Sequence, residues 1–257
     1  MAGTLTAKDY VASLDLSGIR RARGMESTVT EAGAVFDSAK NQAQVVGSAL
    51  FSFAQGVTPA VREAISDSAL LAQLVANKRH ASAQAPMEWY AEYESVLENV
   101  GWVMQSGGWT DYSADGTAVE VHEKIIEVLT VALGPSVAAL TIIKTALDAL
   151  QHMQPGSSWL TIFSRESQQA KIARFQIGLA ETGEHDDVFV TLLACLIEAK
   201  SDLTQVLFFK YRKEHAAFKA NNEKVSINGP SLADLGPTIR AKIRAYQNDY
   251  LSSIQDI

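Results

Sequence analysis

The sequence contains a single cysteine, Cys195, among its 257 residues. An internal disulfide needs two cysteines, so the fold has to be stabilised by packing alone. Hydrophobic residues make up 47% of the chain and charged residues 20%, which is typical of a globular protein and argues against disorder. Cys195 lies in an apolar run, where it is either a small buried side chain or an acylated membrane anchor.

Positive charge is also scarce. The chain has 22 Lys and Arg against 29 Asp and Glu, which gives a formal net charge of −7. The densest basic tract, Arg20–Arg23, is too short for the concentrated positive face that phosphate binding requires. We therefore expect no nucleic-acid partner and no strong attraction to anionic lipid. Arg21 and Arg23 are candidate sites for activating cleavage, and the alternative is a solvated basic turn.

No hydrophobic run is long enough to cross a membrane as a helix. The longest uncharged and strongly apolar stretch, Val128–Ile143, is interrupted by Gly134–Pro135 and is shorter than the ~20 residues that a spanning helix needs. The first ten residues, MAGTLTAKDY, lack the charged segment and the apolar run of a standard signal peptide. We therefore expect a protein that is soluble at rest.

Motifs of enzymes and metal sites are missing as well. We find no GxSxG elbow, phosphate-binding loop, zinc motif or dinucleotide fingerprint. The five histidines have no metal-ligand spacing. We therefore expect no catalytic residue, no cofactor, no metal and no small-molecule substrate. His122 is either a pH trigger or an ordinary helix residue, and His185 with Asp186 and Asp187 is either a weak cation site or a solvated turn.

Residues 1–118 form the first of four parts, and this part is predicted to be mainly helical. Thr58–Pro59 is typical of a helix start, and apolar spacing extends that helix to Arg79. Apolar residues at helical spacing predict a second helix over Met87–Gln105. Trp109 follows in a loop or a short strand and is the tryptophan best placed to meet a lipid interface.

Residues 119–153 are predicted to form a helical hairpin. Polar residues recur at steps of three and four over Val119–Leu133, and a narrow polar stripe marks Ser136–Met153. Each helix keeps a broad apolar side, which is suited to lying on a sheet. The residues expected to form this covering surface are Ile125, Ile126, Leu129, Leu133, Leu140, Ile143 and Leu147.

Residues 157–228 show the pattern of a sheet. A short strand is predicted at Ser158–Ser164. Alternating or continuous apolar residues predict three longer strands, at Lys171–Glu181, Val188–Ile197 and Gln205–His215. The third strand continues over Ala216–Asn228. The last part, residues 232–257, is predicted as a C-terminal helix with an apolar stripe that reaches Ile254.

These strands are unusually long. Globular strands usually have about 5–6 residues, whereas a bilayer-crossing strand needs about 9–11. Backbone groups in lipid must be satisfied by neighbouring strands, so consecutive hairpins suit insertion, and the helical hairpin would shield them in water. The alternative is an ordinary α/β core. The residues expected to enter lipid are Phe175, Ile177, Leu179, Val188, Val190, Leu192, Leu196, Leu207, Phe209 and Tyr211.

Several of these segments resemble the Cyt-type cytolytic delta-endotoxins. The segments are Lys124–Gly134, Trp159–Glu166, Gln205–Lys210 and Leu232–Leu235. The order of elements is also similar, with a helix pair, a short aromatic strand, and then three long strands of which the second carries a lone cysteine. The resemblance covers about residues 119–235, while residues 1–118 and the long C-terminal helix depart from the family pattern.

The resemblance implies one α/β (α+β) domain of three layers, with a central antiparallel sheet of long strands wrapped by helical hairpins. It also implies a pore-forming or detergent-like cytolysin without an enzymatic step, released or deposited by its producer. Its helices would move away while the strands enter the phospholipid of a target-cell membrane and the protein forms a homo-oligomer there. Two alternatives stay open, a non-lytic binding protein that keeps this fold and an enzyme of unrecognised type.

Overall fold

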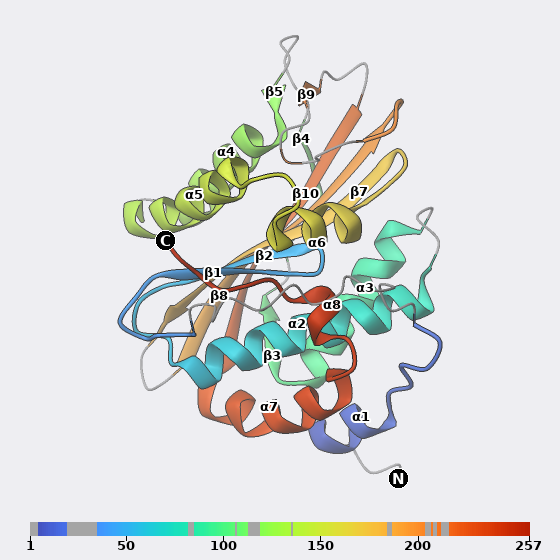
Figure 1. Cartoon of the computed structure of the whole chain (residues 1–257), viewed down its shortest axis with the longest axis vertical. Helices are drawn as coiled ribbons and strands as arrows, with labels where there is room; N and C mark the ends of the chain where they lie inside the picture. The colour runs from blue at the N-terminus through green and yellow to red at the C-terminus, as the bar shows by residue number, and fades with distance from the viewer. Residues whose placement is uncertain are drawn as a thin grey trace.

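The computed structural model describes residues 5–19, 35–81, 85–105, 107–112, 119–134, 136–183, 187–203, 207, 210–211 and 216–257. These residues form an α+β fold of three layers, in which one large sheet lies between two layers of helices (Figure 1). The expected fold class is therefore confirmed.

The central sheet follows the path β11-β1-β2-β7-β8-β10-β3. Neighbouring strands run antiparallel except for β2 and β7, which are parallel. Strand β4 pairs with β10 and β6 with β7, while β5 and β9 form a separate pair. The strands are β1 (Gln42–Val46), β2 (Ala49–Phe53), β3 (Trp102–Gln105), β4 (Thr110–Tyr112), β5 (Val119–Glu120), β6 (Gln168–Gln169), β7 (Ile172–Thr182), β8 (Asp187–Ala199), β9 (Lys210–Tyr211), β10 (Ala216–Asn228) and β11 (Gln255–Asp256).

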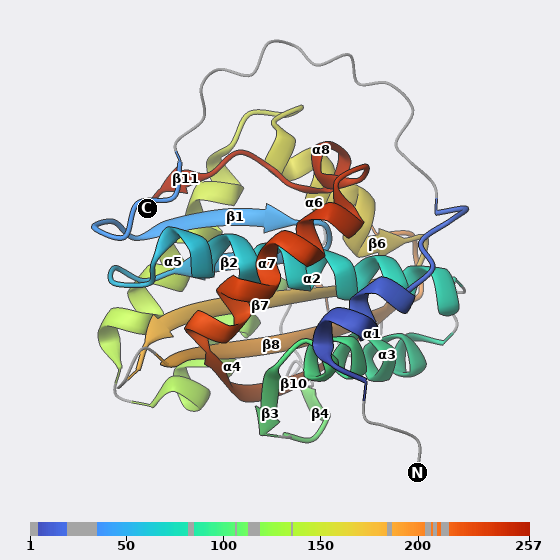
Figure 2. The ribbon, with the colours of Figure 1, turned by 90° about the horizontal axis from the view of Figure 1, so that it is seen from below.

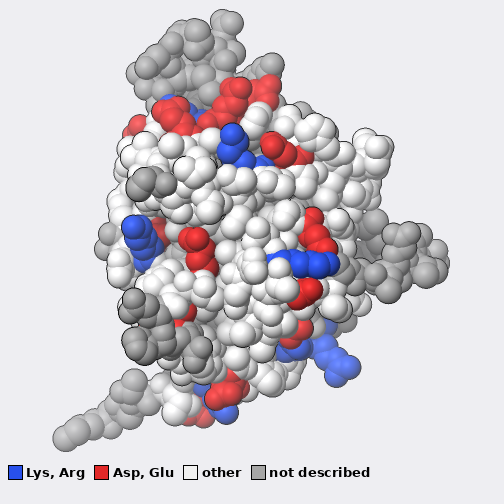
Figure 3. Space-filling model, turned by 90° about the vertical axis from the view of Figure 1, so that its left-hand side faces the viewer, with Lys and Arg blue, Asp and Glu red and all other residues white. Residues whose placement is uncertain are grey.

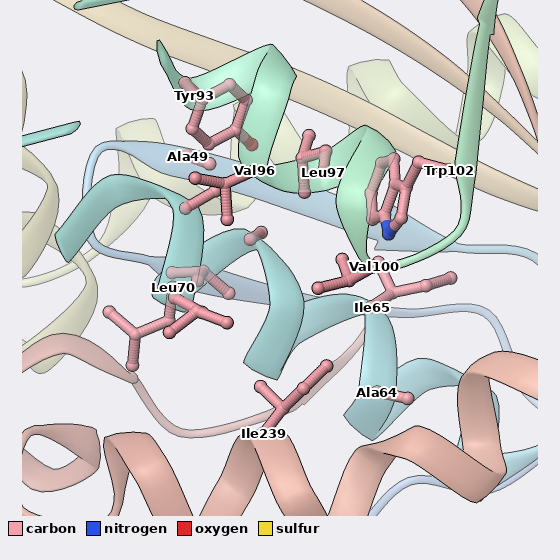
Figure 4. Close-up of a cluster of buried hydrophobic side chains, with 14 of the residues drawn as sticks. Ala49, Ala64, Ile65, Leu70, Tyr93, Val96, Leu97, Val100, Trp102 and Ile239 are labelled. Atoms are coloured by element: carbon pink, nitrogen blue, oxygen red, sulfur yellow. The ribbon is translucent and has the colours of Figure 1, made fainter. Parts of the chain in front are cut away.

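Helices α2 (Pro59–Arg79) and α3 (Pro86–Asn99) cover one face of the sheet. Helix α7 (Gly229–Ile243) packs on the outer side of α2, and α1 (Ala7–Ser13) packs on α7 (Figure 2). Helix α2 is therefore buried between the sheet and α7 along most of its length. Figure 4 shows the side chains that join these elements, with residues of α2, α3 and α7 meeting in one apolar cluster.

Helices α4 (Val121–Leu133), α5 (Val137–His152) and α6 (Ser158–Ser167) cover the opposite face. Helix α5 packs on β2 and β7, and α6 packs on β1, β2 and β7. Helix α4 packs against α5, and the two form a hairpin (Figure 1). The predictions of this hairpin, of a helix ending at Arg79 and of long strands over β7 and β8 are confirmed.

Three predictions of secondary structure are wrong. The segment Ser158–Ser164 is not a strand but the first part of α6, because Ser157 caps a helix there and accepts a hydrogen bond from the Leu160 N–H at 3.4 Å. The helix predicted over Met87–Gln105 stops at Asn99, because Gly101 adopts a φ of +99° and the chain continues as β3.

The C-terminal helix does not reach Ile254. Helix α7 ends at Ile243, a short helix α8 (Gln247–Tyr250) follows, and the chain then returns to the edge of the sheet as β11. The hydroxyl of Ser252 accepts a hydrogen bond from the Val45 N–H at 2.9 Å, so tertiary pairing overrides the helical pattern here. Residues 1–118 hold helices α1–α3 and also strands β1–β4. Of these strands only β4 was among the alternatives for the sequence, as the short strand after Trp109.

Candidate functional site

The candidate site consists of the three longest strands of the sheet. Strands β7, β8 and β10 contain 11, 13 and 13 residues. They lie side by side, with register running from Ile172 opposite Glu198 to Thr182 opposite Val188 between β7 and β8. Each strand reaches the ~9–11 residues of a bilayer-crossing strand. Most of the predicted strand over Gln205–His215 lies outside the described residues, and the third long strand is β10.

Side chains of these strands alternate between the two helical layers, as the pleat of a strand requires. Of the residues expected to enter lipid, Phe175, Ile177 and Leu179 pack with α4, α5 and α6, as does Leu207. Three others pack in the opposite core with α2 and α3; these are Val188, Val190 and Leu192. Leu196 is buried at 1% exposure. Phe209 and the side chain of Tyr211 lie outside the described part of the chain.

The residues expected to form the cover belong to one apolar cluster with the sheet. Ile125, Leu129, Ile143 and Leu147 are buried in it. The remaining three are partly buried and pack against it; these are Ile126, Leu133 and Leu140. The seven positions predicted from helical spacing therefore lie together over the sheet.

The polar side chains of the α4–α5 hairpin form ion pairs and hydrogen bonds mainly within their own helix. Lys124 Nζ lies 2.7 Å from Glu127 Oε1 on the same helix. The hydroxyls of Thr130, Thr141 and Thr145 each donate to the backbone carbonyl four residues earlier, at 2.7 to 2.9 Å. Lys124 also lies over the ring of Tyr112 in β4, with its Nζ 5.9 Å from the centroid. The described contacts that join this hairpin to the sheet are thus mainly apolar.

The opposite layer is attached to the sheet through buried hydrogen bonds. Arg62 of α2 has no exposed surface, and its guanidinium donates to Gln42 Oε1 and to the carbonyls of Lys40, Ala54 and Val57, at 2.8 to 2.9 Å. These acceptors belong to β1 and to the segments that flank β1 and β2. A buried guanidinium is stable only when such acceptors satisfy it.

Two more side chains extend this attachment. Gln73 of α2 donates from Nε2 to the Val46 carbonyl at 2.9 Å and accepts from the Ser48 N–H at 2.9 Å. The hydroxyl of Tyr90 in α3 lies 2.6 Å from the Cys195 carbonyl and 3.1 Å from the Phe175 carbonyl. One phenol of α3 therefore contacts the backbones of both β7 and β8.

The buried carboxyl of Glu223 on β10 is a feature that the sequence did not indicate. Burial raises its pKa to about 7, and the nearby Glu94 carboxyl of α3 adds to the rise. Its Oε1 accepts from Asn221 Nδ2 at 2.6 Å. Glu94 and Glu223 belong to elements far apart in the sequence, so no local pattern could have paired them.

Several single-residue hypotheses can be placed in the structure. Cys195 is fully buried in β8 on the side of α4–α6, and burial raises the pKa of its thiol well above the ordinary value. Trp109 is half-buried and packs on Tyr90, with ring centroids 4.9 Å apart. His122 Nδ1 lies 3.2 Å from Glu120 Oε2. Arg21 and Arg23 lie outside the described residues.

The outer surface around the α4–α5 turn carries exposed apolar side chains. Val131 near the end of α4 is 82% exposed, and Val137 at the start of α5 is 76% exposed. Figure 3 views the side of the molecule on which α5 and the C-terminus lie in Figure 1, and charges of both signs are scattered there among uncharged side chains. No helix in the described part of the chain is long and apolar enough to cross a membrane.

No protein-family model matches the sequence. No curated protein matches it either. Among solved structures, a delta-endotoxin is similar, with 12% identity, a TM-score of 0.40, and coverage of 81% of this chain and 88% of that chain. The activated Cyt2Ba monomer from Bacillus thuringiensis subsp. israelensis has 13% identity and a TM-score of 0.28, and covers 48% of this chain and 71% of its own.

The Evf virulence factor is also similar, with 10% identity, a TM-score of 0.31, and coverage of 75% of this chain and 71% of that chain. The chain is thus distantly similar in structure to toxin and virulence proteins. Because every TM-score is below 0.5, its function has to be inferred from its own contacts.

Proposed function

We propose that this protein is a cytolytic toxin that permeabilises target-cell membranes. The α4–α5 hairpin leaves the sheet at the lipid surface, and the long strands β7, β8 and β10 enter the phospholipid and form a homo-oligomer there. The observation that carries this proposal is the difference between the two helical layers. Apolar contacts hold the hairpin, whereas buried hydrogen bonds hold α2 and α3.

Apolar contacts can be exchanged for lipid at little cost. Burying a large aliphatic side chain stabilises the protein in water by about 1.5–3 kcal/mol, so a hairpin with several such residues stays closed in water. Hydrocarbon is as apolar as leucine, so the same side chains lose little when they move from the sheet into lipid. Buried hydrogen bonds such as those of Arg62 have no replacement in hydrocarbon, which favours the hairpin as the part that moves.

Dye release from zwitterionic liposomes tests the proposal, with and without protease trimming and over a range of pH. Two matched variants sharpen it. Ile143→Ala weakens α5, and Ile65→Ala weakens α2; both isoleucines are fully buried, on opposite faces of the sheet. Each truncation destabilises the protein by about 2–5 kcal/mol. We expect Ile143→Ala to lower the protein concentration needed for release, and Ile65→Ala not to.

Absence of release under all these conditions would contradict cytolysis. Equal effects of the two isoleucine variants would contradict the hairpin as the moving part, because general destabilisation would then explain the release.

The single cysteine offers a direct probe of hairpin movement. Cys195 faces the α4–α6 side, while its neighbour Ala194 faces the α2–α3 side. We expect liposomes to increase the rate at which a lipid-soluble thiol reagent labels Cys195, because the departing hairpin exposes this residue to the bilayer. A cysteine introduced by Ala194→Cys in a Cys195→Ser background should stay protected. Protection of both positions on membranes, or equal labelling of both, would argue against a selective movement of the hairpin.

The composition of β10 favours a second candidate function, a non-lytic binding protein that keeps this fold. Asn221 and Glu223 of β10 are buried polar residues, and burying polar groups in lipid is costly. This alternative predicts a stable complex with a protein or carbohydrate, no dye release, and a Cys195 thiol that stays protected on liposomes.

A further inference from the structure

A cavity of about 390 Å³ lies where the end of α2 meets the end of α6 and the start of β7. Figure 2 shows α6 and β6 close to this end of α2. The volume is in the range of small-molecule sites. Most of its lining residues are polar, among them Asn77, Arg165, Glu166, Ser167, Gln168 and Arg174.

The wall of this cavity carries one unmatched positive charge. Arg165 and Glu166 neutralise each other, with Arg165 Nε 2.5 Å from Glu166 Oε1. Among the described residues, no carboxylate lies within ion-pair distance of Arg174. Burial lowers the pKa of Arg174, and the nearby Tyr90 and Glu166 oppose this change without cancelling it.

The guanidinium of Arg174 is held in a fixed position. It lies over the ring of Trp89 at 4.6 Å from the centroid, and its Nη2 donates to Asn77 Oδ1 at 3.3 Å. Asn77 Oδ1 also accepts from Trp89 Nε1 at 2.8 Å. A planar guanidinium fixed in this way is suited to bind a carboxylate or phosphate oxygen.

Three buried polar atoms of the lining residues have no partner in the described part of the chain: Arg174 Nη1, Ser167 Oγ and Gln168 Oε1. Buried polar atoms are normally satisfied by protein groups or ordered water, so a polar molecule in the cavity would supply partners for these three. The arginine needs an acceptor, while Gln168 Oε1 needs a donor, so the ligand has to offer both.

We propose that this cavity binds a small oxyanion that also carries hydroxyl groups, with Arg174 as the anion-binding residue and Ser167 and Gln168 as its polar partners. A soluble phosphorylated polyol and the glycerophosphate head group of a lipid share this chemistry. The site lies at the far end of α6 from the α4–α5 turn and does not depend on the movement of the hairpin.

Thermal unfolding of the full chain with glycerol 3-phosphate tests the site. At a concentration ten times the Kd, we expect the Tm to rise by about 3 °C. Inorganic phosphate should give a smaller rise, and glycerol alone none. Flotation with vesicles that contain phosphatidylglycerol, compared with pure phosphatidylcholine, distinguishes a lipid head group from a soluble ligand. A Tm rise with glycerol 3-phosphate, or stronger binding to the phosphatidylglycerol vesicles than to pure phosphatidylcholine, supports the proposal.

Variants separate binding from folding. Arg174→Gln should abolish the Tm rise and Arg174→Lys should weaken it, whereas Arg79→Gln, which alters a surface arginine paired with Glu92, should keep it. Ser167→Ala should raise the Tm of the free protein, because it removes a buried hydroxyl without a partner, and should reduce the rise caused by glycerol 3-phosphate.

Two results would overturn the proposal. One is the absence of any Tm rise with phosphate or glycerol 3-phosphate together with equal binding to vesicles with and without phosphatidylglycerol, which would leave a solvent-filled cavity. The other is a rise that persists unchanged in Arg174→Gln. Neither result bears on dye release, so this site and the cytolytic function can fail separately.

Discussion

The two helical layers cover the same sheet by different means. On one side, α2 and α3 reach the sheet through the buried side chains of Arg62, Gln73 and Tyr90, which bond to backbone groups of the strands and their turns. On the other side, the hydroxyls of Thr130 and Thr141 bond within their own helices, and the contacts to the sheet are apolar. Both layers bury apolar side chains of the sheet, but only the first also reaches it through directional hydrogen bonds.

The two kinds of contact contribute differently: apolar contacts stabilise a layer on the sheet, whereas hydrogen bonds fix its position. Apolar contacts are non-directional and contribute in proportion to the area that they bury. Buried hydrogen bonds contribute little net free energy when they form, but leaving their partners unsatisfied is costly. The α2–α3 layer is therefore fixed in one position, while the α4–α5 hairpin is held only as strongly as water is excluded.

The largest expected effect is that of Arg62→Met. The substitution leaves the carbonyls of Lys40, Ala54 and Val57 without their buried donor. We expect the free energy of unfolding to fall by about 3–5 kcal/mol in urea titrations. The matched change Lys144→Met on the exposed side of α5 should alter it by less than about 0.5 kcal/mol. A loss below about 1 kcal/mol for Arg62→Met would contradict the conclusion that buried hydrogen bonds fix the α2–α3 layer on the sheet.

The sequence predicted the apolar layer better than the polar one. Helical spacing identified the covering residues Ile125, Ile143 and Leu147, because apolar periodicity is a local property. At α6 the prediction of a short strand is wrong although Trp159, Ile162 and Phe163 follow helical spacing, because Ser157 was not recognised as a helix cap. Helical spacing also extended the predicted second helix beyond Gly101, where the backbone turns and β3 begins.

The polar attachments could not be found in the same way. Tyr90 and Cys195 are 105 positions apart, and their hydrogen bond exists only because the fold brings α3 onto β8. The partner of Glu223 on α3 is equally remote. Long-range pairing of this kind leaves no mark on local periodicity, so the sequence indicates which residues are apolar but not which layer is fixed.

The second prediction concerns the carboxyl of Glu223 at the α3 side. Burial raises its pKa to about 7, above the ~4.3 of an unfolded chain. The folded state therefore favours the protonated form, and its stability falls as pH rises from about 4.3 to about 7. Glu223→Gln should raise the free energy of unfolding by about 2 kcal/mol at pH 8, after allowance for partial solvation, and by almost nothing at pH 4.

Urea titrations across this pH range check the prediction, with Glu88→Gln as the control from the exposed surface of α3. A gain for Glu223→Gln that is equal at pH 4 and pH 8 would show that the amide packs better than the acid. The carboxyl of Glu223 would then not make the packing of α3 on β10 weaker as the pH rises.

The smallest expected effect comes from removing one hydroxyl from each layer. Tyr90→Phe deletes the donor that the carbonyls of Cys195 and Phe175 share, and we expect a loss of about 1–2 kcal/mol. Thr141→Val deletes a hydroxyl of α5 that bonds to Val137 on its own helix, and we expect a change within about 0.5 kcal/mol. Both substitutions keep the size of the side chain, so urea titrations compare the hydroxyls directly.

Which of the two substitutions costs more free energy of unfolding matters more than the size of the difference between them. A hydroxyl that joins α3 to two strands belongs to the attachment of a layer, whereas one that returns to its own helix does not. If Thr141→Val cost as much as Tyr90→Phe, the hairpin would depend on its polar groups, and lipid could no longer replace what holds it. If Tyr90→Phe alone is costly, the result supports a hairpin that is held to the sheet by apolar contacts, while a hydrogen-bonded hydroxyl also holds α3 to β7 and β8.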